Sequence, residues 1–253
     1  MRILALYDIH GNIDALEAVI ADPRAAHPGL VVVGGDAVPG RFCREVLDRL
    51  ASLPAPVEWV RGNGEREVAA AAADGAAPAA EDATDPRDTT DTAALTARET
   101  ATRLGPERAR PLGELPLTLE RDGVLFCHAT PRRDDEMITR FSPAARLDDA
   151  LDGIHASLVV AGHTHQQDDR AAATTRFINA GSVGLPYEGD GAARWLWIED
   201  GIPDLRSTAY DHTAAGNRML AAGWPDADSI KAALIDPIDP AEVTELFEPS
   251  ANS

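Results

Sequence analysis

The stretch RILALYDIHGN, residues 2–12, decides the fold class of this chain. It begins with an apolar run from Arg2 to Tyr7 that has the length of a buried strand. Asn12 has the residue type of a helix cap, and the apolar residues from Ile13 to Ile20 recur at helical spacing until Pro23. The stretch therefore predicts a strand, a short polar turn and a helix.

Five more apolar runs of strand length follow. They are Leu30 to Val33, Val57 to Val60, Val124 to Cys127, Leu158 to Ala161 and Arg176 to Ile178. A second helix is predicted over Cys43 to Leu53, so strands and helices alternate as in an α/β domain. Later, Arg194 to Glu199 and Leu205 to Tyr210 alternate like half-buried strands around the turn Asp200-Gly201. The sheet system is therefore expected to extend to about Tyr210.

These patterns predict a main domain over residues 1–211 and a C-terminal helical extension over 212–253. Within the main domain, Val68 to Ala94 is rich in Ala, Asp and Thr and shows no hydrophobic period. We expect this segment to be a mobile, solvated insertion or a weakly helical cap.

Charge and composition exclude several classes of protein. The 23 basic and 42 acidic residues give a net charge of −19, which argues against unaided binding to nucleic acid or to an anionic membrane. Asp8 comes too early for a signal peptide, and no apolar run approaches the roughly 18 residues of a membrane span. Cys43 and Cys127 are too few for a disulfide scaffold, and an intracellular chain would keep them reduced. The chain is therefore predicted to be cytoplasmic. A homo-oligomer stays open.

Side chains that commonly bind metals follow the apolar runs in order. They are Asp8 and His10, Asp36, Asn63, His128, and the pair His163 and His165. In a mostly parallel sheet these positions gather at the carboxyl edge, where open α/β folds bind ligands. The i, i+2 spacing lets both members of each pair reach one centre from an extended backbone. Any one motif arises by chance, but the ordered set indicates a metal site.

This set resembles that of the calcineurin-like metallophosphoesterases, whose pattern runs D-x-H, G-D, G-N-H-D/E, a lone His and G-H-x-H. The motifs here are Asp8-Ile9-His10, Gly35-Asp36, Gly62-Asn63-Gly64-Glu65, His128 and Gly162-His163-Thr164-His165. The segment Asn179 to Gly184 is similar to the N-x-G-S-x-G of the small prokaryotic phosphodiesterase branch. The resemblance implies a four-layer α/β/β/α sandwich of two sheets flanked by helices.

The resemblance also implies two divalent transition metals. Asp8, His10, Asp36 and His165 would hold one metal, and Asp36, Asn63, His128 and His163 the other. The mixed ligands suit Mn²⁺ as first choice, with Fe, Zn²⁺ or Ni²⁺ as alternatives. The implied catalytic residues are Asp36, Asn63 and His128, and the implied reaction is attack by a bridging hydroxide on a small phosphoester.

We therefore expect a phosphodiesterase. Two alternatives stay open: a phosphomonoesterase, such as a protein Ser/Thr phosphatase or a dinucleoside polyphosphate hydrolase, and a non-catalytic metal-binding scaffold. Gly64 stands where relatives have a histidine that protonates the leaving oxygen, so esters with acidic leaving groups should be preferred. The missing side chain should also open space for a second ester group. His155 or a nearby arginine could replace the acid.

Other residues near the motifs receive more modest interpretations. Asn12 is either a helix cap or a phosphate contact, and Ser182 is a turn residue rather than a nucleophile. Glu65 could orient Asn63 or His128. Four arginines near the motifs could bind a charged end of the substrate: Arg41, Arg66, Arg132 and Arg133. Arginines exposed to solvent are the commoner case.

Overall fold

The computed structural model of the chain describes residues 1–75, 89–172 and 175–251. The strands are β1 (Arg2–Leu6), β2 (Leu30–Val33), β3 (Val57–Trp59), β4 (Thr118–Arg121), β5 (Val124–Cys127), β6 (Leu158–Ala161), β7 (Gln167–Ala171), β8 (Arg176–Ala180), β9 (Ala193–Glu199) and β10 (Ile202–Thr208). The α-helices are α1 (Ile13–Ala21), α2 (Cys43–Ala51), α3 (Asn63–Ala73), α4 (Thr89–Leu104), α5 (Pro106–Ala109), α6 (Ala144–Ala150), α7 (His212–Ala221), α8 (Ala227–Ile230) and α9 (Pro240–Ala251). Short 3-10 helices are η1 (Pro23–Ala25) and η2 (Arg110–Glu114), and η3 (Lys231–Ile235) is a π-helix.

The strands form two five-stranded sheets. The first has the order β10-β9-β1-β2-β3, in which β1, β2 and β3 run parallel. The second has the order β4-β5-β6-β8-β7, in which β5, β6 and β8 run parallel. Each sheet therefore presents the carboxyl ends of its parallel strands together, as the metal-site prediction requires.

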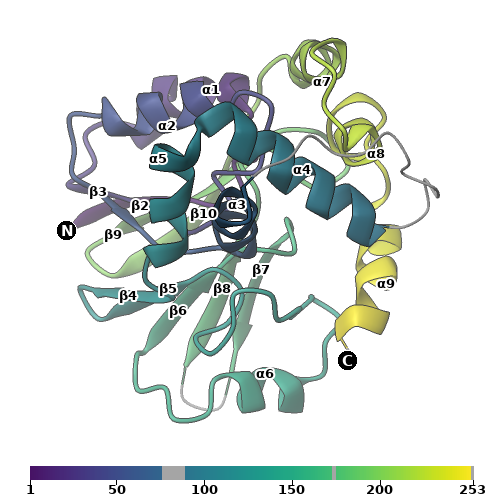
Figure 1. Cartoon of the computed structure of the whole chain (residues 1–253). Coiled ribbons are helices and arrows are strands. Elements are labelled where there is room, and N and C mark those ends of the chain that lie inside the picture. Colours follow the sequence, from purple (N-terminus) through teal and green to yellow (C-terminus); the bar gives the residue numbers. More distant parts are fainter. Residues whose placement is uncertain (76–88, 173–174, 252–253) are drawn as a thin grey trace.

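The sheets pack face to face, with helices on both outer faces (Figure 1). Residues such as Val32 from the first sheet and Phe126 from the second share one core cluster between the sheets. Leu16 of α1 and Val46 of α2 pack on the outer face of the first sheet, whereas Leu147 of α6 packs on that of the second. The predicted four-layer α/β/β/α sandwich is confirmed.

The predicted strands and the first two helices occur close to their expected bounds. Asn12 caps α1, because its Oδ1 accepts a hydrogen bond from the backbone N–H of Ala15 at 3.1 Å. The last strand begins at Ile202, directly after the turn, rather than at Leu205. Its register opposite β9 starts with Ile202 against Glu199, so the short turn sets the pairing.

Of the two alternatives predicted for Val68 to Ala94, a solvated insertion is wrong for the first residues, whereas the described ends of the segment are helical. Helix α3 continues to Ala73, and Val68 is completely buried. Val68 and Ala72 pack against Ala97 of α4 in a small cluster. Alanine methyl groups supply much of this packing, so no strong hydrophobic period marks the sequence. The segment from residue 89 to 94 lies in α4, and residues 76–88 lie outside the described part of the chain.

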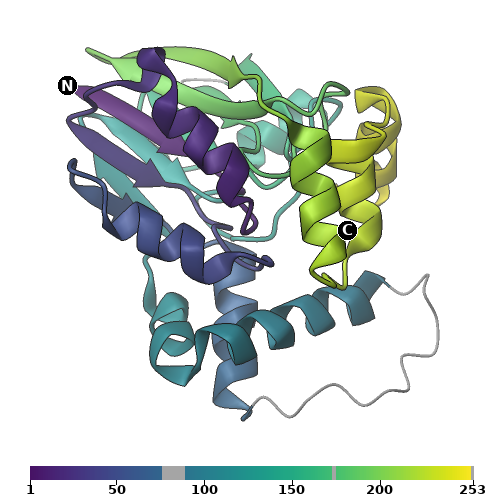
Figure 2. The same cartoon turned by 90° about the horizontal axis from the view of Figure 1, so that it is seen from above.

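The residues after 211 form helices α7, α8 and α9 together with η3, and Figures 1 and 2 show these helices beside one another, away from the N-terminus. Gln166 anchors α9: its amide donates to the carbonyl oxygens of Tyr187 at 2.9 Å and Pro240 at 2.7 Å. Thr244 Oγ1 donates to Gln166 Oε1 at 2.7 Å. The boundary at residue 211 stays a prediction. None of the described helices has the length and apolar character of a transmembrane span.

The core between the sheets should dominate stability. Phe126→Ala removes a fully buried ring, so we expect a loss of about 3–5 kcal/mol in the free energy of unfolding, measured with urea. Leu246→Ala on α9 is the control, because that side chain is 70% exposed and its removal should cost less than about 0.5 kcal/mol. Equally small losses of stability in both variants would show that Phe126 is not part of the core between the sheets.

Candidate metal centre

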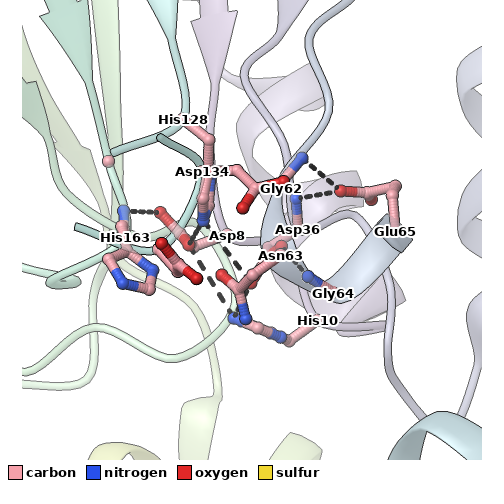
Figure 3. Close-up of polar contacts among 12 residues, drawn as sticks. Asp8, His10, Asp36, Gly62, Asn63, Gly64, Glu65, His128, Asp134 and His163 are labelled. Carbon is pink, nitrogen blue, oxygen red and sulfur yellow. Dashed lines mark hydrogen bonds and ion pairs between the residues drawn. The ribbon is translucent and has the colours of Figure 1, made fainter. Parts of the chain in front are cut away.

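The seven predicted ligands lie just beyond the carboxyl ends of strands from both sheets. Asp8 and His10 follow β1, Asp36 follows β2, Asn63 begins α3 after β3, His128 follows β5, and His163 and His165 follow β6. Figure 3 shows side chains from both sheets facing one another at this point. The structure thus brings the ordered motifs together at the junction of the sheets.

Backbone hydrogen bonds hold these loops in register beyond the strands. The N–H of Asp8 donates to the Gly35 carbonyl at 3.1 Å, and the N–H of His10 donates to the Asp36 carbonyl at 2.9 Å. Between the sheets, the N–H of Gly184 donates to the Asp8 carbonyl at 3.0 Å. The positions of Asp8, His10 and Asp36 are therefore set by the main chain before any metal binds.

Five of the seven residues have a left-handed backbone. They are Asp8, His10, Asp36, His163 and His165, with φ between 47° and 70°. The extended backbone expected for the two i, i+2 pairs is therefore wrong. Left-handed φ is uncommon for residues with a Cβ and costs roughly 1–3 kcal/mol each, and such residues concentrate at functional sites. Here the sharp turns direct neighbouring side chains toward one centre.

One group of side chains centres on Asp8 and His165. Asp8 Oδ1 lies 3.3 Å from His165 Nε2 and 3.9 Å from His10 Nε2, and the two Nε2 atoms are 3.1 Å apart. The Nδ1–H of His165 donates to the Leu185 carbonyl at 2.8 Å. Because a carbonyl can only accept, this bond fixes the proton on Nδ1 of the neutral ring and leaves the Nε2 lone pair facing Asp8.

A second group centres on His128, which is completely buried. Its Nδ1–H donates to the Gly34 carbonyl at 3.0 Å, so its Nε2 lone pair faces inward. This nitrogen lies 3.6 Å from Asp36 Oδ2 and 3.8 Å from Asp8 Oδ1. Asp36 Oδ2 is also 3.8 Å from His10 Nε2. Both Asp36 and Asp8 therefore lie between the two groups.

Three buried polar atoms in this cluster have no hydrogen-bond partner: Asp8 Oδ1, Asn63 Oδ1 and His128 Nε2. Leaving such an atom unpaired costs about 1–3 kcal/mol, and more for a charged group. Carboxylate, amide and imidazole donors that point at common centres are a suitable ligand set for transition metals. The residues present therefore fit a dinuclear divalent-metal site.

The pKa values of the cluster support the same conclusion. Burial, together with the neighbouring His165 ring, lowers the pKa of His10 to about 3. Burial and the nearby His128 ring lower the pKa of His163 to about 3. Both imidazoles are therefore neutral at neutral pH, as metal ligands must be. Burial, with Glu65 and Asp8 nearby, raises the pKa of Asp36 well above its usual range, and a bound cation would offset this effect.

His163 and Asn63 lie at the border of the cluster. The backbone N–H of His163 donates to Asp8 Oδ2 at 2.9 Å, whereas its ring lies edge-on to the His128 ring with centroids 5.0 Å apart. Asn63 Nδ2 lies 3.5 Å from Glu67 Oε1, which leaves Asn63 Oδ1 for the centre. The assignment of seven ligands to two metals stays a prediction, because the distances make Asp8 as suitable a bridge as Asp36.

Glu65 holds the backbone of two ligand loops rather than a ligand side chain. Its carboxylate, fully buried, accepts from the N–H groups of Asp36 at 2.7 Å, Gly62 at 2.9 Å and Val38 at 3.3 Å. It stands at the third position of α3, from which an acidic side chain folds back onto the residue that caps the helix. The expected contact with Asn63 or His128 is replaced by this backbone role.

Gly64 does not leave the open space that the sequence suggested. A Cβ at this position would overlap the Val38 carbonyl oxygen and lie 2.6 Å from Pro39 Cδ. The backbone N–H of Gly64 donates to Asp36 Oδ1 at 2.8 Å. The loop after β2 therefore fills the position of the missing histidine side chain, and the expectation of extra room here is wrong.

Three further residues considered from the sequence, Ser182, Asn12 and His155, do not belong to the metal centre. Ser182 Oγ donates to the Asp8 carbonyl at 2.7 Å and accepts from Leu185 N–H at 2.8 Å, which confirms it as a turn residue. Asn12 uses Nδ2 on the Gly184 carbonyl and Oδ1 as a helix cap, so it is structural. His155 precedes the amino end of β6, opposite to the metal centre, and cannot replace the missing acid.

A cavity of about 330 Å³ extends from the metal centre. Its lining includes His10, Asp36, Asn63 and His165, together with residues that no motif identified: Glu67, Thr96, Tyr187, Met219, Trp224, Asp226 and Asp228. Tyr187 stacks on the His165 ring with centroids 5.1 Å apart. Only the folded C-terminal helices bring most of these residues to the site, so the sequence alone held no signal for them.

The four arginines considered as contacts for the substrate all pair with carboxylates. The pairs are Arg41 with Glu99, Arg66 with Asp134, Arg132 with Glu136, and Arg133 with Asp135. None of the four is among the described residues that line the cavity. They are therefore structural or solvated side chains.

Comparison with known proteins identifies the class. The model of the calcineurin-like phosphoesterase superfamily domain matches residues 1–198, and the chain belongs to this superfamily. Its class is that of metal-dependent hydrolases of phosphoesters.

Two solved structures support the fold. A metallophosphoesterase from Sphaerobacter thermophilus has 24% identity and a TM-score of 0.71, and the match covers 94% of this chain and 99% of that one. A hypothetical protein from Pyrococcus horikoshii OT3 has 19% identity and a TM-score of 0.74, with the same coverage of 94% and 99%. No curated protein matches the chain.

Asp36 provides a direct test of the metal centre. Asp36→Asn removes an anionic ligand that lies between the two groups, so we expect lower metal content by mass spectrometry and a loss of turnover by orders of magnitude. Asp204→Asn in β10 is the control, because that side chain is 57% exposed and pairs with Arg206. Wild-type metal content and turnover in Asp36→Asn would exclude a dinuclear site at this position.

Gly64 provides a steric test of the same loops. In Gly64→Ala the new methyl group meets the Val38 carbonyl, so we expect a loss of about 1–3 kcal/mol in stability and weaker metal binding. Gly29→Ala is the matched control, since its Cβ would approach no atom closer than 3.4 Å. Thermal unfolding and metal titration of both variants measure the effect, and equal behaviour would argue against the tight packing at Gly64.

Proposed function

We propose that this chain is a phosphodiesterase dependent on two divalent transition metals, with Mn²⁺ as the first choice. The observation that carries the proposal is the charge of the cavity beside the metal centre: its described lining holds Glu67, Asp226 and Asp228 but neither lysine nor arginine. A diester has one negative charge, whereas a monoester approaches two at neutral pH. Beyond the metals, such a cavity favours the diester.

The size of the cavity supports the same substrate class. About 330 Å³ next to His10, Asp36 and His165 accommodates a small organic group on the phosphate. Gly64 adds a second argument, because it provides no side chain to protonate the leaving oxygen. Esters whose leaving groups need no proton are therefore the expected substrates.

The residues of the cluster have separable roles in this proposal. Bound metals would supply Lewis-acid activation of a phosphoryl oxygen and of the attacking water. Asp8, His10, Asp36, His128 and His165 would hold the metals through the atoms that face the two centres.

Asn63 offers its unpaired Oδ1 at the rim of the centre. The Glu65 carboxylate keeps the loops of Asp36 and Gly62 fixed, so the ligands need little rearrangement.

The partners and the compartment follow from the same features. We propose a small phosphoester as the substrate, because the cavity is confined and the chain has a net charge of −19. The cytoplasm is the proposed compartment, supported by Cys43 and Cys127, which are both buried free thiols.

The function is tested with Mn²⁺-loaded protein and a series of phosphodiesters whose leaving groups have graded pKa values. Without a general acid, rates should depend steeply on leaving-group pKa, since such an acid is worth about 10²–10⁴ in rate. Bis(p-nitrophenyl) phosphate should also be cleaved faster than an alkyl phosphomonoester.

The Asp36→Asn variant measures the background rate in this assay. Faster cleavage of monoesters would indicate a phosphomonoesterase. A flat leaving-group dependence, with the chemical step rate-limiting, would reveal an acid elsewhere. Gly64→His is unsuitable for restoring the acid, because its Cβ would overlap the Val38 carbonyl.

A further inference from the structure

The cavity beside the metal centre has a far wall that lies outside the superfamily domain. Met219, Trp224, Asp226 and Asp228 contribute to this wall, whereas the domain match ends at residue 198. The near wall consists of the metal-site residues, among them His10 and Asp36. A group attached to a phosphate at the metals would therefore meet side chains from the segment after the matched domain.

The carboxylates of the wall are open toward a ligand. Asp226 Oδ1 accepts from the N–H of Ser229 at 3.2 Å as the cap of α8, and the described contacts leave its Oδ2 free. Glu67 is half-buried, and its Oε1 lies 3.5 Å from Asn63 Nδ2. Asp228 is more exposed and lies 3.5 Å from Lys231 Nζ, so it contributes less. The negative charge of the wall comes mainly from Asp226 and Glu67.

The nearby arginines contact mainly other carboxylates, so they compensate the charge of the wall only in part. Arg66 Nε lies 3.1 Å from Asp134 Oδ2, and its Nη2 lies 3.9 Å from Glu67 Oε1, so Asp226 is the less compensated of the two carboxylates. Arg218 Nη2 lies 2.6 Å from Asp14 Oδ2. The Arg218 guanidinium also lies 4.4 Å from the centroid of the Phe42 ring. Neither arginine is among the described residues of the cavity lining.

Aromatic side chains complete the wall. Trp224 is 8% exposed and packs in a cluster with Leu185 and Met219, and Tyr187 is held by stacking on His165. Aromatic rings combined with carboxylates are the lining that recognises an ammonium group, since both attract a cation and the rings tolerate its alkyl substituents. The described lining holds neither lysine nor arginine to neutralise a second phosphate.

From this combination we infer the substrate class: a phosphodiester in which one alcohol bears an amine or quaternary ammonium group. The inference rests on the proposed diesterase function and deepens it. The phosphate would lie at the metals, and the cationic alcohol would lie against Trp224, with Asp226 and Glu67 supplying the counter-charge. Dinucleoside polyphosphates fit poorly, because each additional phosphate adds negative charge next to these carboxylates.

The test uses two p-nitrophenyl phosphodiesters of equal shape. In one the second alcohol is choline, and in the other it is 3,3-dimethylbutanol, in which carbon replaces the charged nitrogen. The Mn²⁺-loaded full chain should cleave the choline ester with a kcat/KM at least about tenfold higher. Because the charge also changes intrinsic reactivity, the ratio of the two values is compared between wild type and variants.

Asp226→Asn and Glu67→Gln should each lower this ratio several-fold. Asparagine is as good a helix cap as aspartate, so the first substitution keeps α8 intact. Asp211→Asn is the matched control: Asp211 caps α7 through the N–H of Ala214 and is not among the described lining residues. Its ratio should stay at the wild-type value.

The outcomes separate this inference from the proposed function. A wild-type ratio near one, or a ratio that neither cavity variant changes, overturns the inference and leaves the diesterase function intact. If only monoesters are cleaved, the diesterase function fails. Phosphocholine and 3,3-dimethylbutyl phosphate then form the matched pair. The ratio of their kcat/KM values, compared between wild type and variants, decides the inference in the same way. If neither diesters nor monoesters are cleaved, both proposals fail.

Discussion

The buried carboxylate of Asp8 is the interaction on which the rest of the site depends. It follows β1 of the first sheet, yet its Oδ2 accepts from the N–H of His163 after the second sheet. Its Oδ1 faces Nε2 of His10 from the first sheet and Nε2 of His128 and His165 from the second. A carboxylate without water is costly unless it is paired. The close packing of the sheets thus creates an electrostatic demand that cations satisfy. The same buried carboxylate therefore lowers the stability of the metal-free protein and raises its affinity for metal.

Much of the fold could be predicted because buried parallel strands consist of continuous apolar runs. Runs such as Leu158 to Ala161 identify strands directly, and the polar residues that follow them identify the site. Helix α3 was harder, because Ala69 and Ala72 bury methyl groups without producing a hydrophobic stripe. Propensity and pattern cannot show which alanines are covered when the covering element, α4, comes later in the chain.

The identity of the candidate ligands was likewise readable, but their geometry was not. Left-handed conformations at Asp8 and His165 depend on hydrogen bonds between loops that are distant in sequence. The packing of Val38 against Gly64 follows from the path of the main chain, which no residue type reveals. The same holds for Trp224, which looks in the sequence like any core tryptophan and reaches the cavity only through the docking of the C-terminal helices.

Gln166 gives this docking a particular significance, because it comes directly after His165 in the chain. Gln166 is 2% exposed, and its side-chain amide joins Pro240 and Thr244 of helix α9 to the segment that carries the histidine. Anything that fixes His165 therefore also fixes the anchor of α9, and by thermodynamic reciprocity the docked helix favours the ordered histidine. Chelation would then loosen the metal centre together with helix α9, whose Phe247 lies edge-on to Tyr187 of the cavity lining. Under the proposed function, selectivity and activity would be lost together, so a partly demetallated population would lose activity without accepting more substrates.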